Sequence, residues 1–225
     1  MTQVAVAAYC ERVGTGLWAE PLNTFSNLAF LLAAVLLIHA MRERRLSPLR
    51  LFDLSLLISL LFAIGIGSGL WHTLATPWSE WADVVPILLF ISVYLLSYLV
   101  RIAGLRPGYV VFWFLLFHVT NTGLQLLLPQ ETLNGSLFYL PTLAVLLIFT
   151  AHSRALALPH AHLYLKATLL FGLSLTLRTL DPAWCAAWPI GTHFIWHLLN
   201  AYVLFLLTSA LLPRSAATGR RAEAR

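Results

Sequence analysis

The sequence predicts an all-α integral membrane protein, a bundle of seven transmembrane helices. Hydrophobic residues make up 60% of the 225 positions and charged residues only 10%, whereas about a quarter of the residues in a soluble domain are charged. The apolar residues form seven runs of about 20 residues, the length that a helix needs to cross the hydrocarbon core. Because only helices satisfy all their backbone polar groups within such a run, each run is expected to be helical.

The seven spans follow one another with short connections, several of which contain turn-forming residues such as Arg106-Pro107-Gly108, Asn134-Gly135 and Asp181-Pro182. We expect the spans at residues 22–41, 51–74, 82–101, 108–128, 134–153, 162–180 and 190–212. They form a single domain, residues 1–213, and the polar, basic tail at 214–225 is expected to be disordered. Residues 1–21 lack the basic start and long apolar core of a secretory signal.

The basic residues predict the orientation of the bundle, because they gather in cytoplasmic loops. With seven spans, one side of the membrane carries Arg42, Arg44, Arg45, Arg50, Arg101, Arg106, Arg154, Arg214, Arg220, Arg221 and Arg225. The other side carries Arg12 and Arg178. We therefore expect the N-terminus outside and the C-terminus in the cytoplasm. The formal net charge of +5 lies mainly in these loops and does not indicate a nucleic-acid partner.

Two histidines open the last span. His193 and His197 are four residues apart, so on a helix they stand one turn above another, about 6 Å along the axis, where both imidazoles can bind one metal ion. Polar side chains at membrane depth usually mark function. The alternative is that the two rings form hydrogen bonds to neighbouring helices.

Other polar side chains fall at the same outer depth. Ser68 and His72 lie one turn apart at the end of the second span, and Asp83 lies at the start of the third. The first span begins with a polar stripe, Glu20, Asn23, Ser26 and Asn27. Taken singly, Ser68 fits close helix packing, Asp83 fits a helix cap, and the stripe fits hydrogen bonding between helices.

Taken together, three histidines at one depth indicate a catalytic metal. Three neutral imidazoles that leave a fourth position open are the ligand set of catalytic zinc. The other histidines, which lie near the middle of a span or near the cytoplasmic ends, are interpreted as structural or interfacial: His39, His118, His152, His160 and His162.

Both cysteines fall on the outer side, Cys10 before the first span and Cys185 before the last. An oxidising exterior permits a disulfide between them. On the residues alone, two unrelated cysteines fit the topology equally well.

The order of these residues resembles the alkaline ceramidases, a branch of a broader superfamily of seven-helix membrane hydrolases that includes the adiponectin-receptor and hemolysin III-like proteins. The resemblance rests on Ser68-x-x-x-His72, Asp83 eleven residues later, and His193-x-x-x-His197. The N-terminal stretches Cys10-Glu11 and 20–27, with sequence EPLNTFSN, favour the ceramidase branch. The resemblance covers all seven spans.

This resemblance implies roles for the matching residues. His72, His193 and His197 would bind zinc, Asp83 would act on the attacking water, and Ser68 would complete the polar site. Cys10 and Cys185 match the positions of a family disulfide. The implied reaction is hydrolysis of a ceramide or a related N-acyl lipid to a fatty acid and a sphingoid base, at a site facing the non-cytoplasmic side.

The resemblance also implies a calcium site, for which Glu11, Glu20 and Asn23 are the remaining candidates. Ala8 stands where the family has an aspartate, and the stretch from Glu11 to Glu20 is shorter. Calcium takes six to eight oxygen ligands, so the sequence leaves calcium binding open.

Two alternatives to a ceramidase stay open on the sequence. One is a receptor-like seven-helix protein with a structural zinc, because a fold and a site do not establish turnover. The other is a hydrolase of a different lipid amide or ester, because nothing in the sequence recognises a sphingoid head group.

Overall fold

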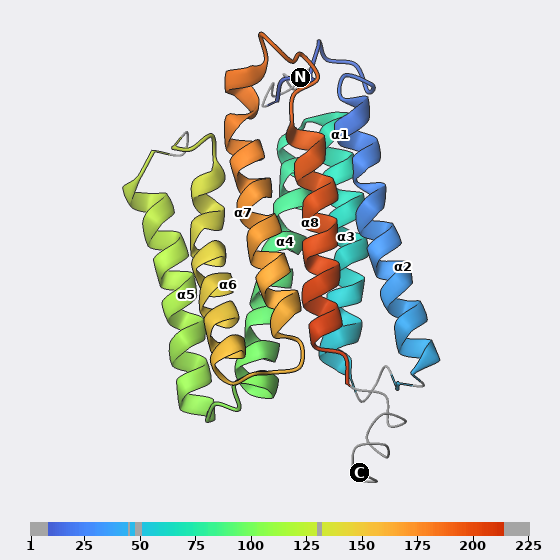
Figure 1. The fold of residues 1–225 in the computed structure, drawn as a ribbon. Helices are drawn as coiled ribbons and strands as arrows, with labels where there is room; N and C mark the ends of the chain where they lie inside the picture. The colour runs from blue at the N-terminus through green and yellow to red at the C-terminus, as the bar shows by residue number, and fades with distance from the viewer. Residues whose placement is uncertain (1–8, 45, 48–50, 130–131, 214–225) are drawn as a thin grey trace.

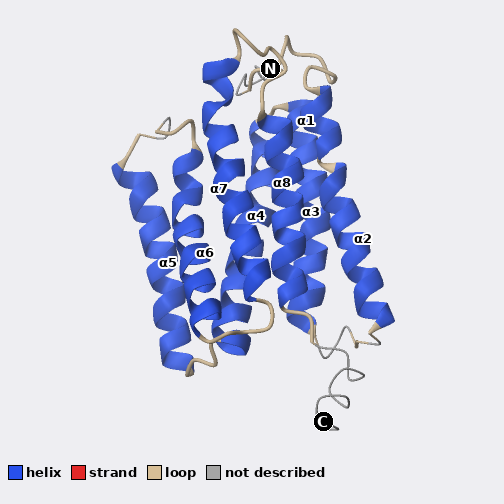
Figure 2. Ribbon diagram, viewed as in Figure 1, coloured by secondary structure: helices blue, strands red, loops and turns tan. Residues whose placement is uncertain are grey.

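The computed structural model describes residues 9–44, 46–47, 51–129 and 132–213, and in this part of the chain it contains helices and loops but no strand (Figure 2). Seven helical segments are long and apolar enough to span a membrane. They are formed by α1 (Pro21–Ser26) with α2 (Leu28–Glu43), α3 (Phe52–Leu74), α4 (Pro77–Ser97) with η1 (Tyr98–Ile102), α5 (Pro107–Leu127), η2 (Ser136–Tyr139) with α6 (Leu140–Ala155), α7 (Ala161–Trp184) and α8 (His193–Ala210). The predicted seven-helix architecture is confirmed. The predicted tail at 214–225 lies outside the described residues.

Helix ends differ from the prediction where local chemistry outweighs hydropathy. The third span begins at Pro77 rather than at residue 82, because Thr76 and Ser79 form a capping box with proline in the first turn. The sixth span continues to Trp184, so Cys185 caps the helix rather than lying in a loop. The last helix begins at His193, three residues later than expected.

Helices α3 and α8 form the centre of the bundle, whereas α5 lies at its edge beside α6 (Figure 1). More than half of the apolar window of each central helix is buried, 56%, against 17% for α5. Segment 9–20 lies at one end of the bundle, and the C-terminal end of α8 lies at the other (Figure 1). The end that carries His72, His193 and His197 is called the histidine end below.

Gly67 brings α3 and α4 into close contact near the histidine end. A Cβ atom at this position would lie 1.9 Å from the carbonyl oxygen of Ala82, so only glycine permits this approach. Small residues commonly allow membrane helices to pack closely. The contact places Ser68, next to Gly67, beside Asp83, next to Ala82.

A disulfide joins Cys10 to Cys185, the pairing that the family resemblance implied. It ties segment 9–20 to the end of α7, next to the start of α8. This N-terminal segment therefore lies against the helices that carry the histidines, and it contributes side chains to their surroundings.

Candidate metal centre

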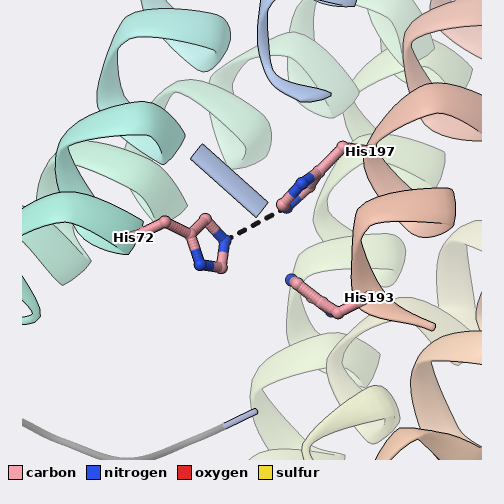
Figure 3. A group of neighbouring side chains, drawn as sticks. All are labelled: His72, His193 and His197. Atoms are coloured by element: carbon pink, nitrogen blue, oxygen red, sulfur yellow. Dashed lines mark hydrogen bonds between the residues drawn. The ribbon is translucent and has the colours of Figure 1, made fainter. Parts of the chain in front are cut away.

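The three predicted ligands His72, His193 and His197 come together between α3 and α8. One nitrogen of each ring lies within 4.8 Å of the others, the only such cluster of metal-ligand type among the described residues. The rings are almost fully buried, with at most 3% of each residue exposed. They converge from facing helices, with His193 and His197 on successive turns of α8 (Figure 3).

Hydrogen bonds assign the tautomers of two of these rings. Nδ1 of His72 lies 2.5 Å from Oε2 of Glu20, so it donates to this carboxylate. Nδ1 of His197 lies 2.7 Å from Oγ of Ser26, and this hydroxyl already donates its one proton to the carbonyl oxygen of Asn23. Ser26 must then accept from His197. Both rings carry their proton on Nδ1 and keep a lone pair on Nε2.

The two Nε2 atoms of His72 and His197 lie 3.1 Å apart (Figure 3). With both protons on the Nδ1 atoms, two lone pairs face the same point and repel one another unless a cation lies between them. Metal-binding histidines characteristically donate their second N–H to a carboxylate or another acceptor. The donor set, its tautomers and its burial therefore fit a metal ion held by three neutral imidazoles.

His193 owes its position to Asp181, a residue that the sequence analysis treated only as part of a turn. The buried Oδ1 of Asp181 accepts hydrogen bonds from the backbone N–H groups of Thr192, at 2.5 Å, and His193, at 3.1 Å. These donors have no partner within the helix, and a negative charge at this end is favourable. Gly191 permits the approach, since a Cβ there would lie 2.3 Å from Oδ1. The ring of His193 stacks on Tyr9 at 3.7 Å.

Ser68 and Asp83 lie together beside the histidines, as their predicted shared depth required. The Ser68 hydroxyl is close enough to interact with the Asp83 carboxylate. Oδ1 of Asp83 is buried and has no hydrogen-bond partner among the described residues. Both side chains line the same cavity as His193 and His197. The site thus offers an unpaired carboxylate oxygen next to three imidazoles.

The cavity has a volume of about 420 Å³ and changes character along its length. Near the histidine end it is lined by polar groups that include Ser68, Asp83 and Arg178. Further in, its walls are apolar, and on α8 they extend to Leu207. Leu207 follows His193 by 14 residues, about 21 Å at the rise of an α-helix. A long apolar chain fits this shape with its polar end at the histidines.

The three calcium candidates all have protein partners. Glu20 forms a buried ion pair with Arg12 and accepts from Asn23 Nδ2 at 2.9 Å, in addition to its bond from His72. Burial acts to raise the pKa of Glu20, but the hydrogen bonds from His72 and Asn23 and the charge of Arg12 together outweigh it, so the pKa is lowered from its ordinary value. Glu11 accepts from the backbone N–H groups of Leu22 and Asn23 at 2.6 and 2.8 Å. Burial raises the pKa of Glu11.

The histidines set aside on the sequence lie outside this cluster. His118 contacts Ser92, His152 contacts Tyr98, and His39 pairs with Glu43. None of the five belongs to a candidate metal cluster in the part of the chain that the structure describes.

Comparison with known proteins gives the family. A family model described as Ceramidase matches residues 2–222, which is almost the whole chain. The chain belongs to the ceramidase family. A sequence comparison with curated proteins gave no match. Membership in the ceramidase family implies hydrolase activity and a lipid substrate, and it agrees with a multi-pass bundle whose apolar cavity ends at a histidine cluster.

Proposed function

We propose that this ceramidase-family protein is a zinc-dependent amidase that hydrolyses ceramide, or a related N-acyl lipid, to a sphingoid base and a free fatty acid. The observation that carries the proposal is the pair of Nε2 lone pairs, on His72 and His197, that face each other at 3.1 Å at the polar end of a long apolar cavity. With both ring protons on the Nδ1 atoms, which donate to Glu20 and Ser26, a cation held between the two Nε2 atoms accounts for that arrangement.

The chemistry follows from the ligand set. His72, His193 and His197 would hold the zinc ion, which when bound polarises a carbonyl group and lowers the pKa of water toward 7. Three protein ligands, rather than four, are typical of catalytic zinc sites. Asp83 and Ser68 stay free for the reaction, since neither is needed as a ligand.

Asp83 supplies the proton transfers. Its unpaired Oδ1 accepts a proton from the attacking water as the C–O bond forms. The same oxygen then returns that proton to the amide nitrogen as the C–N bond breaks, so the products are a carboxylic acid and an amine. The Ser68 hydroxyl donates a hydrogen bond to the carbonyl oxygen as it gains negative charge.

The cavity orients the substrate. The acyl chain lies along the apolar wall toward Leu207, which places the scissile amide near the histidines and the head group beyond them. Removal of a long chain from water provides most of the binding energy, about 0.8 kcal/mol per buried CH₂ group. The polar groups at the histidine end contribute orientation.

The test is hydrolysis by the detergent-purified protein of three lipids with the same acyl chain: a ceramide, an N-acyl ethanolamine and an ester. Products are identified by mass spectrometry, with His197→Ala as the inactive comparison. We expect a free fatty acid and a sphingoid base from ceramide, and no product with the variant. Faster cleavage of the ethanolamide or the ester would reassign the substrate, and cleavage of none would leave a receptor-like protein with structural zinc.

A further inference from the structure

Arg12 is a buried cation in the surroundings of the metal centre. Only 1% of its side chain is exposed, and its Nε donates to Oε1 of Glu20, whose side chain is 2% exposed. A second guanidinium nitrogen donates to the carbonyl oxygen of His72 at 2.7 Å. Arg12 therefore contacts both the carboxylate that orients His72 and the backbone of His72 itself.

A buried carboxylate requires a compensating charge, because an isolated ion is strongly destabilised away from water. Arg12 supplies that charge to Glu20 through one oxygen, while the other oxygen accepts from Nδ1 of His72. The rigid fork of the guanidinium group suits this role, since it bonds the carboxylate and the carbonyl in fixed directions.

Among the residues that the structure describes, the same contacts leave no suitable ligand set for calcium. Both oxygens of Glu20 are engaged by Arg12 and His72, and both oxygens of Glu11 accept backbone N–H groups at the start of α1. The side-chain oxygens of Asn23 and Asn27 are buried without partners among the described residues, but two neutral amides fall far short of six to eight oxygens. A divalent cation here would also be repelled by the fixed charge of Arg12.

We propose that Arg12 is the internal cation of this site, that it holds Glu20 against His72, and that the protein works without calcium. The inference rests on the proposed function, because it takes His72 to be a zinc ligand. Arg12 is a positioning residue: it acts on the metal through Glu20 and does not touch substrate. Loss of such an outer partner typically lowers metal affinity 10–100-fold.

The first test measures calcium directly on the wild-type protein. Calcium and zinc contents are determined by mass spectrometry, and thermal stability and hydrolysis are compared with and without about 1 mM calcium, the weak end of the range for calcium modules, at buffered free zinc. We expect no bound calcium and no change in either property. Stoichiometric calcium, or a clear rise in melting temperature or rate when it is added, would overturn the proposal.

The second test measures zinc affinity by competition with a zinc-binding dye. Arg12→Met is expected to weaken zinc binding by about 10–100-fold. The matched control is Arg101→Met, since Arg101 also pairs with a carboxylate, Asp53, and donates to a backbone carbonyl, that of Leu211. It lies at the opposite end of the bundle and should leave zinc affinity unchanged. Equal zinc affinities of Arg12→Met and wild type would overturn the proposal.

A double variant keeps the test valid if Arg12→Met leaves an unpaired buried charge and folds poorly. Glu20→Gln removes that charge. The loss of zinc affinity in the double variant should be smaller than the sum of the losses in the two single variants, because both substitutions act through the same contact. If the two losses of zinc affinity add, the proposal that Arg12 acts on His72 through Glu20 is contradicted. Failure of the proposed function gives a different result: the wild-type protein binds no zinc, or it cleaves no lipid at any calcium concentration.

Discussion

The carboxylate of Glu20 lies 2.5 Å from Nδ1 of His72, and both side chains are buried. This bond fixes which nitrogen of His72 faces the other two histidines. It also couples segment 9–20, which lies outside the membrane spans, to the candidate metal centre. The N-terminal segment is therefore part of the site rather than an appendage to the bundle.

Glu20→Gln should weaken zinc binding by about 10–100-fold, because an amide is a poorer acceptor for the His72 proton and no longer raises the basicity of the ring. Zinc affinity is measured by competition with a zinc-binding dye. The control is Glu43→Gln, which alters an exposed carboxylate that pairs with His39. An unchanged affinity for Glu20→Gln would show that this bond does not support a metal ligand.

Asp83→Asn should lower kcat by about 10²–10⁴-fold, the usual contribution of general acid–base catalysis, while zinc content stays near that of wild type. The variant keeps the size of the side chain but removes its ability to take a proton. Steady-state hydrolysis and metal analysis on the same preparation separate the two effects, with Asp53→Asn as the control. Retained activity would remove Asp83 from the mechanism.

Gly67→Ala should cost about 1–3 kcal/mol of stability, the usual penalty for overpacking, and should reduce activity. The added Cβ would lie 1.9 Å from the Ala82 carbonyl oxygen, so α4 must move and carry Asp83 away from Ser68. Gly69→Ala is the matched control two residues along the same helix, since nothing lies within 4 Å of a Cβ there. The comparison uses thermal unfolding and hydrolysis, and equal behaviour of the two variants would contradict the packing argument.

Phe149→Val should shift the substrate preference toward longer acyl chains. Phe149 lines the deep part of the cavity and stacks on Tyr98 at 3.5 Å, and nearby Tyr94 donates to the carbonyl oxygen of Leu207 at 3.0 Å. Phe149 forms part of the cavity wall in this region, so a smaller side chain enlarges the cavity there. Relative rates on ceramides of increasing chain length are the measurement, and Ile148→Val, an exposed neighbour, is the control. An unchanged profile would place the end of the acyl chain elsewhere.

The helices and the ligand set followed from the sequence because both depend on regular spacing. Long apolar runs define the spans. His193 and His197 are four residues apart, so they share one face of a helix whatever its tertiary contacts. His72 and Asp83 flank the loop between the second and third spans, and the four spans between that loop and His193 return the chain to the same end. These inferences need only helix geometry and the thickness of a membrane.

The supporting contacts could not be predicted in the same way. Arg12 and Glu20 meet His72 only because segment 9–20 crosses the end of the bundle, and no periodicity describes an irregular segment. The sequence offered Glu20 as a calcium candidate, whereas its observed partners are Arg12 and His72. Asp181 was missed although it was visible as a carboxylate at the end of an apolar run. A buried acid at that position predicts nearby backbone N–H donors, here those of Thr192 and His193.

Metal content tests the central claim most directly. Wild-type protein and His193→Ala are purified in detergent from zinc-replete medium without chelators and analysed by mass spectrometry, with His118→Ala as a control for the loss of a histidine. We predict about one zinc ion per chain in wild type and the control, and its loss in His193→Ala. Wild-type protein that holds no zinc under these conditions would contradict the account, because the three buried histidines would then have no cation to converge on.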